Sequence, residues 1–214
     1  MSKFIKNKKA VMSLTFSHIG LIIATGILFS AVISVVFLND WQKKADIENI
    51  ASSLSTLVQG IDTRFFENVT MLYLPDKNYD YNIGISTEYV TVDTSGNWFN
   101  TLSIKHRFLK KPLLNRNYKE WITGKNFHSF LNDAYGCFGN ETDPIMSTDV
   151  DSVKDEIKSI FEHANFSFSA DPLYLEVEKP VYIEQVFVFY DLDGDNEWYK
   201  ENDEKQSFVL VYQI

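Results

Sequence analysis

The stretch from Leu14 to Leu38, LTFSHIGLIIATGILFSAVISVVFL, decides the architecture of this chain. It contains no Asp, Glu, Lys or Arg, and His18 is its only titratable side chain. At the helical rise per residue, a segment of this length spans roughly 37 Å, which is enough to cross the hydrocarbon layer of a bilayer. We therefore predict one transmembrane helix over residues 14–38.

The flanking charges predict the orientation of this helix. Four lysines precede it, and no acid does: Lys3, Lys6, Lys8 and Lys9. Asp40, Asp46 and Glu48 follow it. Because cytoplasmic flanks are enriched in Lys and Arg, residues 1–13 are expected to form a basic cytoplasmic leader, with the C-terminal part outside the cytoplasm. A cleaved secretory signal is the rival interpretation, but Val35–Asp40 lacks a small-x-small cleavage site, so we expect a retained anchor in the cell membrane.

Residues 39–66 predict an amphipathic helical stem that continues the span. Apolar residues recur there at spacings of three and four, which is one stripe of a helix. The stripe consists of Ile47, Ile50, Leu54, Leu57, Ile61 and Phe65. The opposite face is polar, from Asp46 through Ser53 and Ser55 to Asp62. We expect the stripe to pack on the chain's own C-terminal domain, the alternative being a separate partner protein.

Residues 67–214 predict an α+β extracytoplasmic domain, β-rich, antiparallel and sandwich-like, with one or two short helices. Thr94–Asn97 is a turn cluster that joins two strands into a hairpin. The C-terminal run Ser207–Ile214 is apolar enough for a central, buried strand. Strands are expected at Val69–Leu74, Asn82–Asp93, Trp98–Leu109, Leu173–Val177, Val181–Tyr190 and Ser207–Ile214, and helices at Lys125–Tyr135 and Val150–Ala164, the latter capped by Thr148 or Asp149.

The composition excludes several function classes. From Asn39 onward, 16 basic residues face 29 acidic ones, and this acidic balance argues against nucleic acid as a partner. Cys137 is the only cysteine, so an internal disulfide is impossible and a buried structural thiol is expected rather than a nucleophile. His106, His128 and His163 are not at metal-ligand spacing. With no catalytic or cofactor motif present, we do not expect an enzyme.

The acidic segment DLDGDNEWYKENDE, residues 191–204, resembles a cation-binding loop. Carboxylates at alternate positions of a tight loop can wrap a hard cation such as Ca²⁺. The expected ligands are Asp191, Asp193, Asp195 and Glu197. Asn196 and Asn202 stand where a helix–loop–helix calcium site has Gly and a bidentate Glu. The alternative is a solvated hairpin loop that turns at Gly194.

Three Asn-x-Ser/Thr triplets follow the span. They begin at Asn68, Asn140 and Asn165, and none has Pro at its middle position. Such triplets are glycan acceptors where the host glycosylates exported proteins and the loops are exposed. They are consistent with an extracellular glycoprotein.

The N-terminal residues resemble a known superfamily. A basic leader, the sequence Ser17-His18-Ile19 leading into LIIATGILFSAVISVV, and an amphipathic stem are similar to archaeal type IV pilin-like proteins, in particular archaellum stator subunits of the FlaF/FlaG type. The resemblance covers residues ~8 to 60. It implies cleavage by a prepilin peptidase between Ala10 and Val11, and a place among other pilin-like or envelope proteins. Thr15 stands where many pilins carry Glu, so assembly by the usual charge pairing is not implied.

Two functions are therefore expected as alternatives. The first is a membrane-anchored structural or interaction protein outside the cytoplasm, such as a minor pilin-like or cell-envelope subunit. Its partners would be membrane lipid and other envelope proteins, contacted through the span and stem, where Gly26, Ser30 and Ser34 form a ridge of small residues. The second is an extracytoplasmic ligand- or cation-binding module that acts as a sensor.

Overall fold

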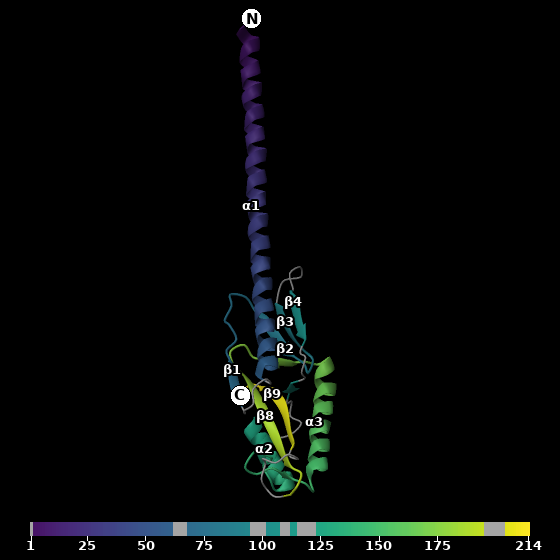
Figure 1. Ribbon diagram of the computed structural model, residues 1–214. Coiled ribbons are helices and arrows are strands. Elements are labelled where there is room, and N and C mark those ends of the chain that lie inside the picture. Colours follow the sequence, from purple (N-terminus) through teal and green to yellow (C-terminus); the bar gives the residue numbers. More distant parts are fainter. Residues whose placement is uncertain (1, 62–67, 95–101, 108–111, 115–122, 195–203) are drawn as a thin grey trace. The chain divides into compact units, whose positions relative to one another are not determined.

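The structure, a computed structural model, describes residues 2–61, 68–94, 102–107, 112–114, 123–194 and 204–214 (Figure 1). The chain forms two compact units, Met1–Asp46 and Ile47–Ile214. It is an α+β protein with one long N-terminal helix and sheets that are mostly antiparallel, which confirms the predicted fold class at this level.

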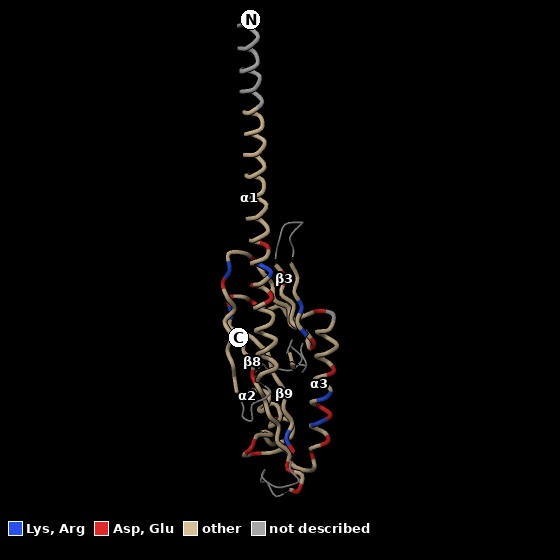
Figure 2. The backbone as a smooth tube through the Cα atoms, turned by 45° about the horizontal axis from the view of Figure 1, so that its top comes forward, with Lys and Arg blue, Asp and Glu red and all other residues tan. Residues whose placement is uncertain are grey.

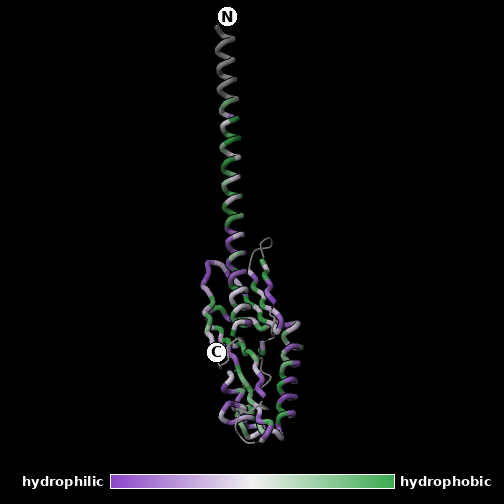
Figure 3. The backbone as a smooth tube through the Cα atoms, in the orientation of Figure 1, coloured by the Kyte–Doolittle hydropathy of each residue, from purple (hydrophilic) through white to green (hydrophobic). Residues whose placement is uncertain are grey.

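Helix α1 (Ser2–Ile61) forms the described part of the first unit and continues into the second. Between Phe16 and Leu38 its large apolar side chains are exposed. This part contains no Asp, Glu, Lys or Arg (Figure 2), and most of its residues are hydrophobic (Figure 3). The hydroxyls of Thr25 and Ser34 donate to the helix's own carbonyls at Leu21 and Ser30. These two hydroxyls are thus satisfied within the helix, as an apolar solvent requires. Among the described helices, α1 alone is long and apolar enough to cross a membrane.

In the second unit, the end of α1 lies in the hydrophobic core. Its buried residues are Ile47, Ile50, Ala51, Leu54, Val58 and Ile61. The stripe therefore packs on the chain's own domain, as expected, while Phe65 lies outside the described residues. Ser55 corrects the expected polar face, because it is only 6% exposed. Its hydroxyl donates to the Arg107 carbonyl at 3.3 Å, so a strand end covers this side of the helix.

The first sheet has the order β1-β8-β9-β5, with β6 paired to β8. Strands β8 and β9 form a long antiparallel hairpin, whereas β5 and β6 pair in parallel with β9 and β8. Strand β9 is central, and its residues Phe208–Tyr212 are all buried, which confirms a central, buried strand here. The strand begins before the predicted Ser207 and ends before Ile214, which is exposed. The bounds are β1 (Asn68–Leu72), β5 (Leu113–Leu114), β6 (Ile145–Met146), β8 (Val181–Asp191) and β9 (Glu204–Tyr212).

The second sheet has the order β4-β3-β2-β7 and corrects one prediction. The single strand expected over Asn82–Asp93 is wrong, because the chain turns within it and forms β2 and β3. The Ser86 hydroxyl makes this turn by accepting from the N–H groups of Glu88 and Tyr89. The expected hairpin with the next strand is present as β3–β4. The bounds are β2 (Tyr81–Ile85), β3 (Tyr89–Thr94), β4 (Ser103–Arg107) and β7 (Leu173–Leu175).

Two further helices complete the second unit. Helix α2 (Gly124–Tyr135) begins with a capping box at Thr123 and ends at Gly136, whose φ of 78° is the left-handed conformation that favours glycine. Helix α3 (Val150–Ala170) is six residues longer than predicted, and the Asp149 side chain forms no cap hydrogen bond. Both sheets share one core with the three helices. The sandwich-like packing of the sheets on each other stays a prediction.

Candidate functional site

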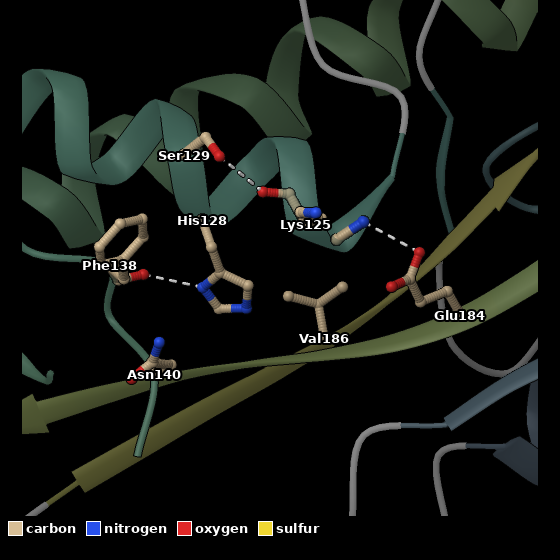
Figure 4. A pocket seen from close by; sticks show the side chains of 8 residues that line it. Lys125, His128, Ser129, Phe138, Asn140, Glu184 and Val186 are labelled. Atoms are coloured by element: carbon tan, nitrogen blue, oxygen red, sulfur yellow. Dashed lines mark hydrogen bonds between the residues drawn. The ribbon is translucent and has the colours of Figure 1, made fainter. Parts of the chain in front are cut away.

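A cleft of about 320 Å³ lies in the second unit between α2 and the first sheet (Figure 4). Its volume is at the lower end of the range for small-molecule sites. Side chains reach it from α2, from the loop after α2 and from β8. The cleft is lined by Gly124, Lys125, His128, Ser129, Phe138, Asn140, Glu184 and Val186.

Glu184 of β8 is held in place by two donors. Its Oε2 accepts from the Gly124 N–H and from the Tyr212 hydroxyl, both at 2.9 Å. The first contact places a carboxylate at the N-terminus of α2, where the helix dipole favours negative charge. A Cβ at position 124 would lie 2.5 Å from Glu184 Oε1, so the close approach requires glycine there. Burial, followed by the hydrogen bond to Glu184, raises the pKa of Tyr212 and keeps its hydroxyl a donor.

His128 and Lys125 contribute polar groups from the first turns of α2. The Nδ1 atom of His128 lies 2.8 Å from the Phe138 carbonyl. A carbonyl only accepts hydrogen bonds, so Nδ1 carries the proton and the ring orientation is fixed. Lys125 is exposed at the rim. The cleft therefore combines donors, one fixed carboxylate and the half-exposed ring of Phe138, an arrangement suited to a small polar ligand.

Of the described residues considered in the sequence as a nucleophile or as metal ligands, His128 alone lines this cleft. Cys137 is buried and free, as expected, and burial raises the pKa of its thiol, which disfavours the reactive thiolate. His106 lies on β4 and His163 on α3. Within the described residues, no group of three or more His, Cys, Asp or Glu side chains is placed to hold a metal ion.

The acidic segment is described only at its beginning. Asp191 ends β8 and is fully buried, and its Oδ1 accepts from the Gly194 N–H at 2.6 Å. Asp193 is exposed, whereas Asp195 and Glu197 lie outside the described residues. The segment runs from the last residue of β8 to the first residue of β9, and these strands pair antiparallel, which confirms the hairpin context. The calcium site itself stays a prediction.

Calcium at a few millimolar is expected to stabilise the protein if the acidic segment binds it. With a dissociation constant of about 10⁻⁴ to 10⁻³ M, the gain would be about 1 to 2 kcal/mol. Replacing Asp193 and Asp195 together with Asn should remove this gain and raise the melting temperature in chelator, because repulsion is relieved. Thermal melts with calcium and with chelator measure both effects. Glu162→Gln on α3 is the control, and a melting temperature that ignores calcium would leave a solvated hairpin loop.

The cleft was not predicted from the sequence. The spacing of His128 from the other histidines does not indicate its bond to a carbonyl ten residues away. Glu184 lies within a strand pattern that conceals its contact with α2, sixty residues earlier. The capping box around Thr123 is a local sequence feature that indicates where α2 begins. It does not indicate that Glu184 lies beside this end of the helix.

Comparison with known proteins adds no identification: no protein-family model, no curated protein and no solved structure matches this chain.

Proposed function

We propose that this chain is a single-pass membrane protein whose second unit lies outside the cytoplasm and serves a structural or interaction role in the cell envelope. The proposal rests on how the exposure of apolar side chains changes along α1. Between Phe16 and Leu38 the apolar side chains are exposed, and from Ile47 onward one face is buried in the domain core. An exposed apolar surface of this extent is unfavourable in water and matches the interior of a bilayer.

The pilin-like resemblance supports the structural role within this proposal. It implies an apolar helix that continues, without a break, as the stem of a β-rich domain. Helix α1 is continuous from Ser2 to Ile61, and the domain that follows contains two sheets. We propose that the partners are membrane lipid and other pilin-like or envelope proteins. Recovery of the chain in purified filaments would support the pilin-like role specifically.

A ligand-binding role is the second candidate, and the cleft between α2 and β8 favours it. A fixed carboxylate, a fixed imidazole and an ammonium group line one concave site. An anchored domain with such a site suits a sensor or a binding module. Ligand-dependent stabilisation of the chain, without recovery in filaments, would favour this role over the structural one.

A reporter enzyme that folds only outside the cytoplasm should be active when fused after Ile214. The reason is that lysines precede the span and acids follow it, which orients the N-terminus inward. Activity in whole cells measures the outcome, and the effect is all or none. The matched control is the same fusion without residues 14–38, which should be inactive. Activity of a cytoplasm-specific reporter at the same position would overturn the proposed location.

A further inference from the structure

We propose that Asn140 is an N-glycosylation site and that the first sugar of its glycan lies in the cleft against Phe138. The inference rests on the proposed location of the second unit outside the cytoplasm. Three triplets share the acceptor pattern, and the secondary structure around each Asn distinguishes them.

The Asn140 side chain is oriented by its own triplet. Its Oδ1 accepts from the Thr142 N–H at 3.0 Å, the Thr142 hydroxyl at 2.9 Å and the Asp143 N–H at 2.9 Å. Because backbone N–H groups can only donate, the oxygen and nitrogen of this amide are unambiguously assigned. The nitrogen Nδ2 makes no hydrogen bond within the described part of the chain. In Figure 4 it lies on the side of Phe138.

The other two acceptors lie within a helix and a strand. Asn165 lies within α3, and its Oδ1 accepts from the Thr87 hydroxyl at 2.8 Å, which joins the helix to the β2–β3 turn. Asn68 pairs with Gln185 in the first sheet, and alternation places its side chain on the side of Leu72, which packs on the core. Both residues therefore lie in regular secondary structure, whereas Asn140 lies in the loop between α2 and β6, the surface setting expected of a glycan acceptor.

Phe138 provides a surface for the first sugar. It precedes Asn140 by two residues, and Gly139, with a φ of +66°, turns the chain between them. The Phe138 side chain is 39% exposed and lines the same cleft as Asn140. A sugar ring has an apolar C–H face that can lie on an aromatic ring, and hydroxyl groups that can bond to Lys125 and Glu184. The cleft that Asn140 lines therefore offers both kinds of contact.

The modification requires a glycosyl donor whose sugar is linked to a lipid through phosphate. A bond forms between Asn140 Nδ2 and the anomeric carbon, while the bond from that carbon to the phosphate oxygen breaks. The lipid phosphate leaves with the electron pair, and Nδ2 loses one proton to a base of the transferase. No oxidation or reduction occurs.

Peptide mass mapping of the full chain, purified from membranes of the organism that encodes it, tests the site. The peptide containing Asn140 should carry a sugar mass, and those containing Asn68 and Asn165 should not. Thr142→Val should abolish the modification, whereas Thr142→Ser should retain it, and Asn165→Gln should change nothing at Asn140. An unmodified Asn140, or modification of Asn68 or Asn165 in its place, would overturn the inference. If the external reporter is active and Asn140 is bare, only the inference fails and the proposed location stands.

Melting of the same protein before and after enzymatic removal of the glycan tests its position in the cleft. Removal should lower the melting temperature by about 2 to 4 °C, the shift expected of one moderate contact in a domain of this size. In Phe138→Ala the site should remain occupied, but removal should leave the melting temperature unchanged. Phe166→Ala, which alters an aromatic ring that is 83% exposed elsewhere, should behave like the unaltered protein. An equal loss in Phe138→Ala would overturn the placement of the sugar against Phe138.

Discussion

Replacing Leu54 with Asp is expected to destabilise the second unit by roughly 3 to 5 kcal/mol. Leu54 is fully buried in the part of α1 that belongs to the domain core. The substitution removes apolar contacts and places a carboxylate among the apolar side chains of the core. Urea unfolding of the full chain in detergent micelles, followed by intrinsic fluorescence, measures the free energy of unfolding.

The neighbouring residue provides the control for this experiment. Ser53 is exposed on the same turn of α1, so Ser53→Asp adds the same charge without burying it. Its effect should stay within about 0.5 kcal/mol, as is usual for surface substitutions. Equal effects at the two positions would mean that the stem is not part of the domain core.

The features predicted correctly are those with a strong local period. The 3.6-residue stripe that includes Ile47 and Leu54 indicated both a helix and its buried face, because apolar side chains at that spacing share one side. The continuous apolar run of β9 indicated a central strand, because both faces of such a strand are covered. Helix α2 begins one residue before the predicted Lys125 and ends at the predicted Tyr135. The Thr123 cap and the left-handed Gly136 flank it.

The features that were missed depend on contacts between distant segments. The sequence pattern assigns Ser55 to the polar, solvent-facing side of the helix. Its burial depends on the end of β4, which lies beside it in the fold. The β2–β3 turn depends on one Ser86 hydroxyl inside a run that otherwise has strong strand propensity. The cleft requires α2, the loop at Phe138 and β8 to meet. Contacts between distant segments produce no periodic pattern in the sequence. Tertiary packing can also override the local secondary-structure preference that a sequence pattern indicates.

The end of α3 is a case of this kind and leads to the second large effect. The sequence predicts a helix that ends at Ala164, and the following Phe166-Ser167-Phe168-Ser169 alternates apolar and polar residues as a strand does. In the structure the buried stripe continues at helical spacing through Ile157, Ala164 and Phe168, and the helix ends just before Pro172. Burial of one large ring outweighs the weak helix propensity of the Ser and Asn residues around it.

Phe168→Ala is therefore expected to destabilise the second unit by about 3 to 5 kcal/mol, because truncating a buried Phe removes its contacts and leaves a cavity. The ring is only 1% exposed, and its loss should also increase amide exchange over the last turns of α3. Urea unfolding and hydrogen exchange of the full chain measure these two effects.

Phe166→Ala is the matched control, since it removes the same side chain two residues earlier in the same helix. Phe166 is 83% exposed, so its truncation should change the free energy of unfolding by no more than about 0.5 kcal/mol. If the segment were a strand with alternating faces, Phe166 and Phe168 would lie on one side and the two substitutions would have similar effects. In a helix they lie about 200° apart, so one ring is buried while the other is exposed. A large difference between the two variants would therefore establish the helical extension, and similar effects would refute it.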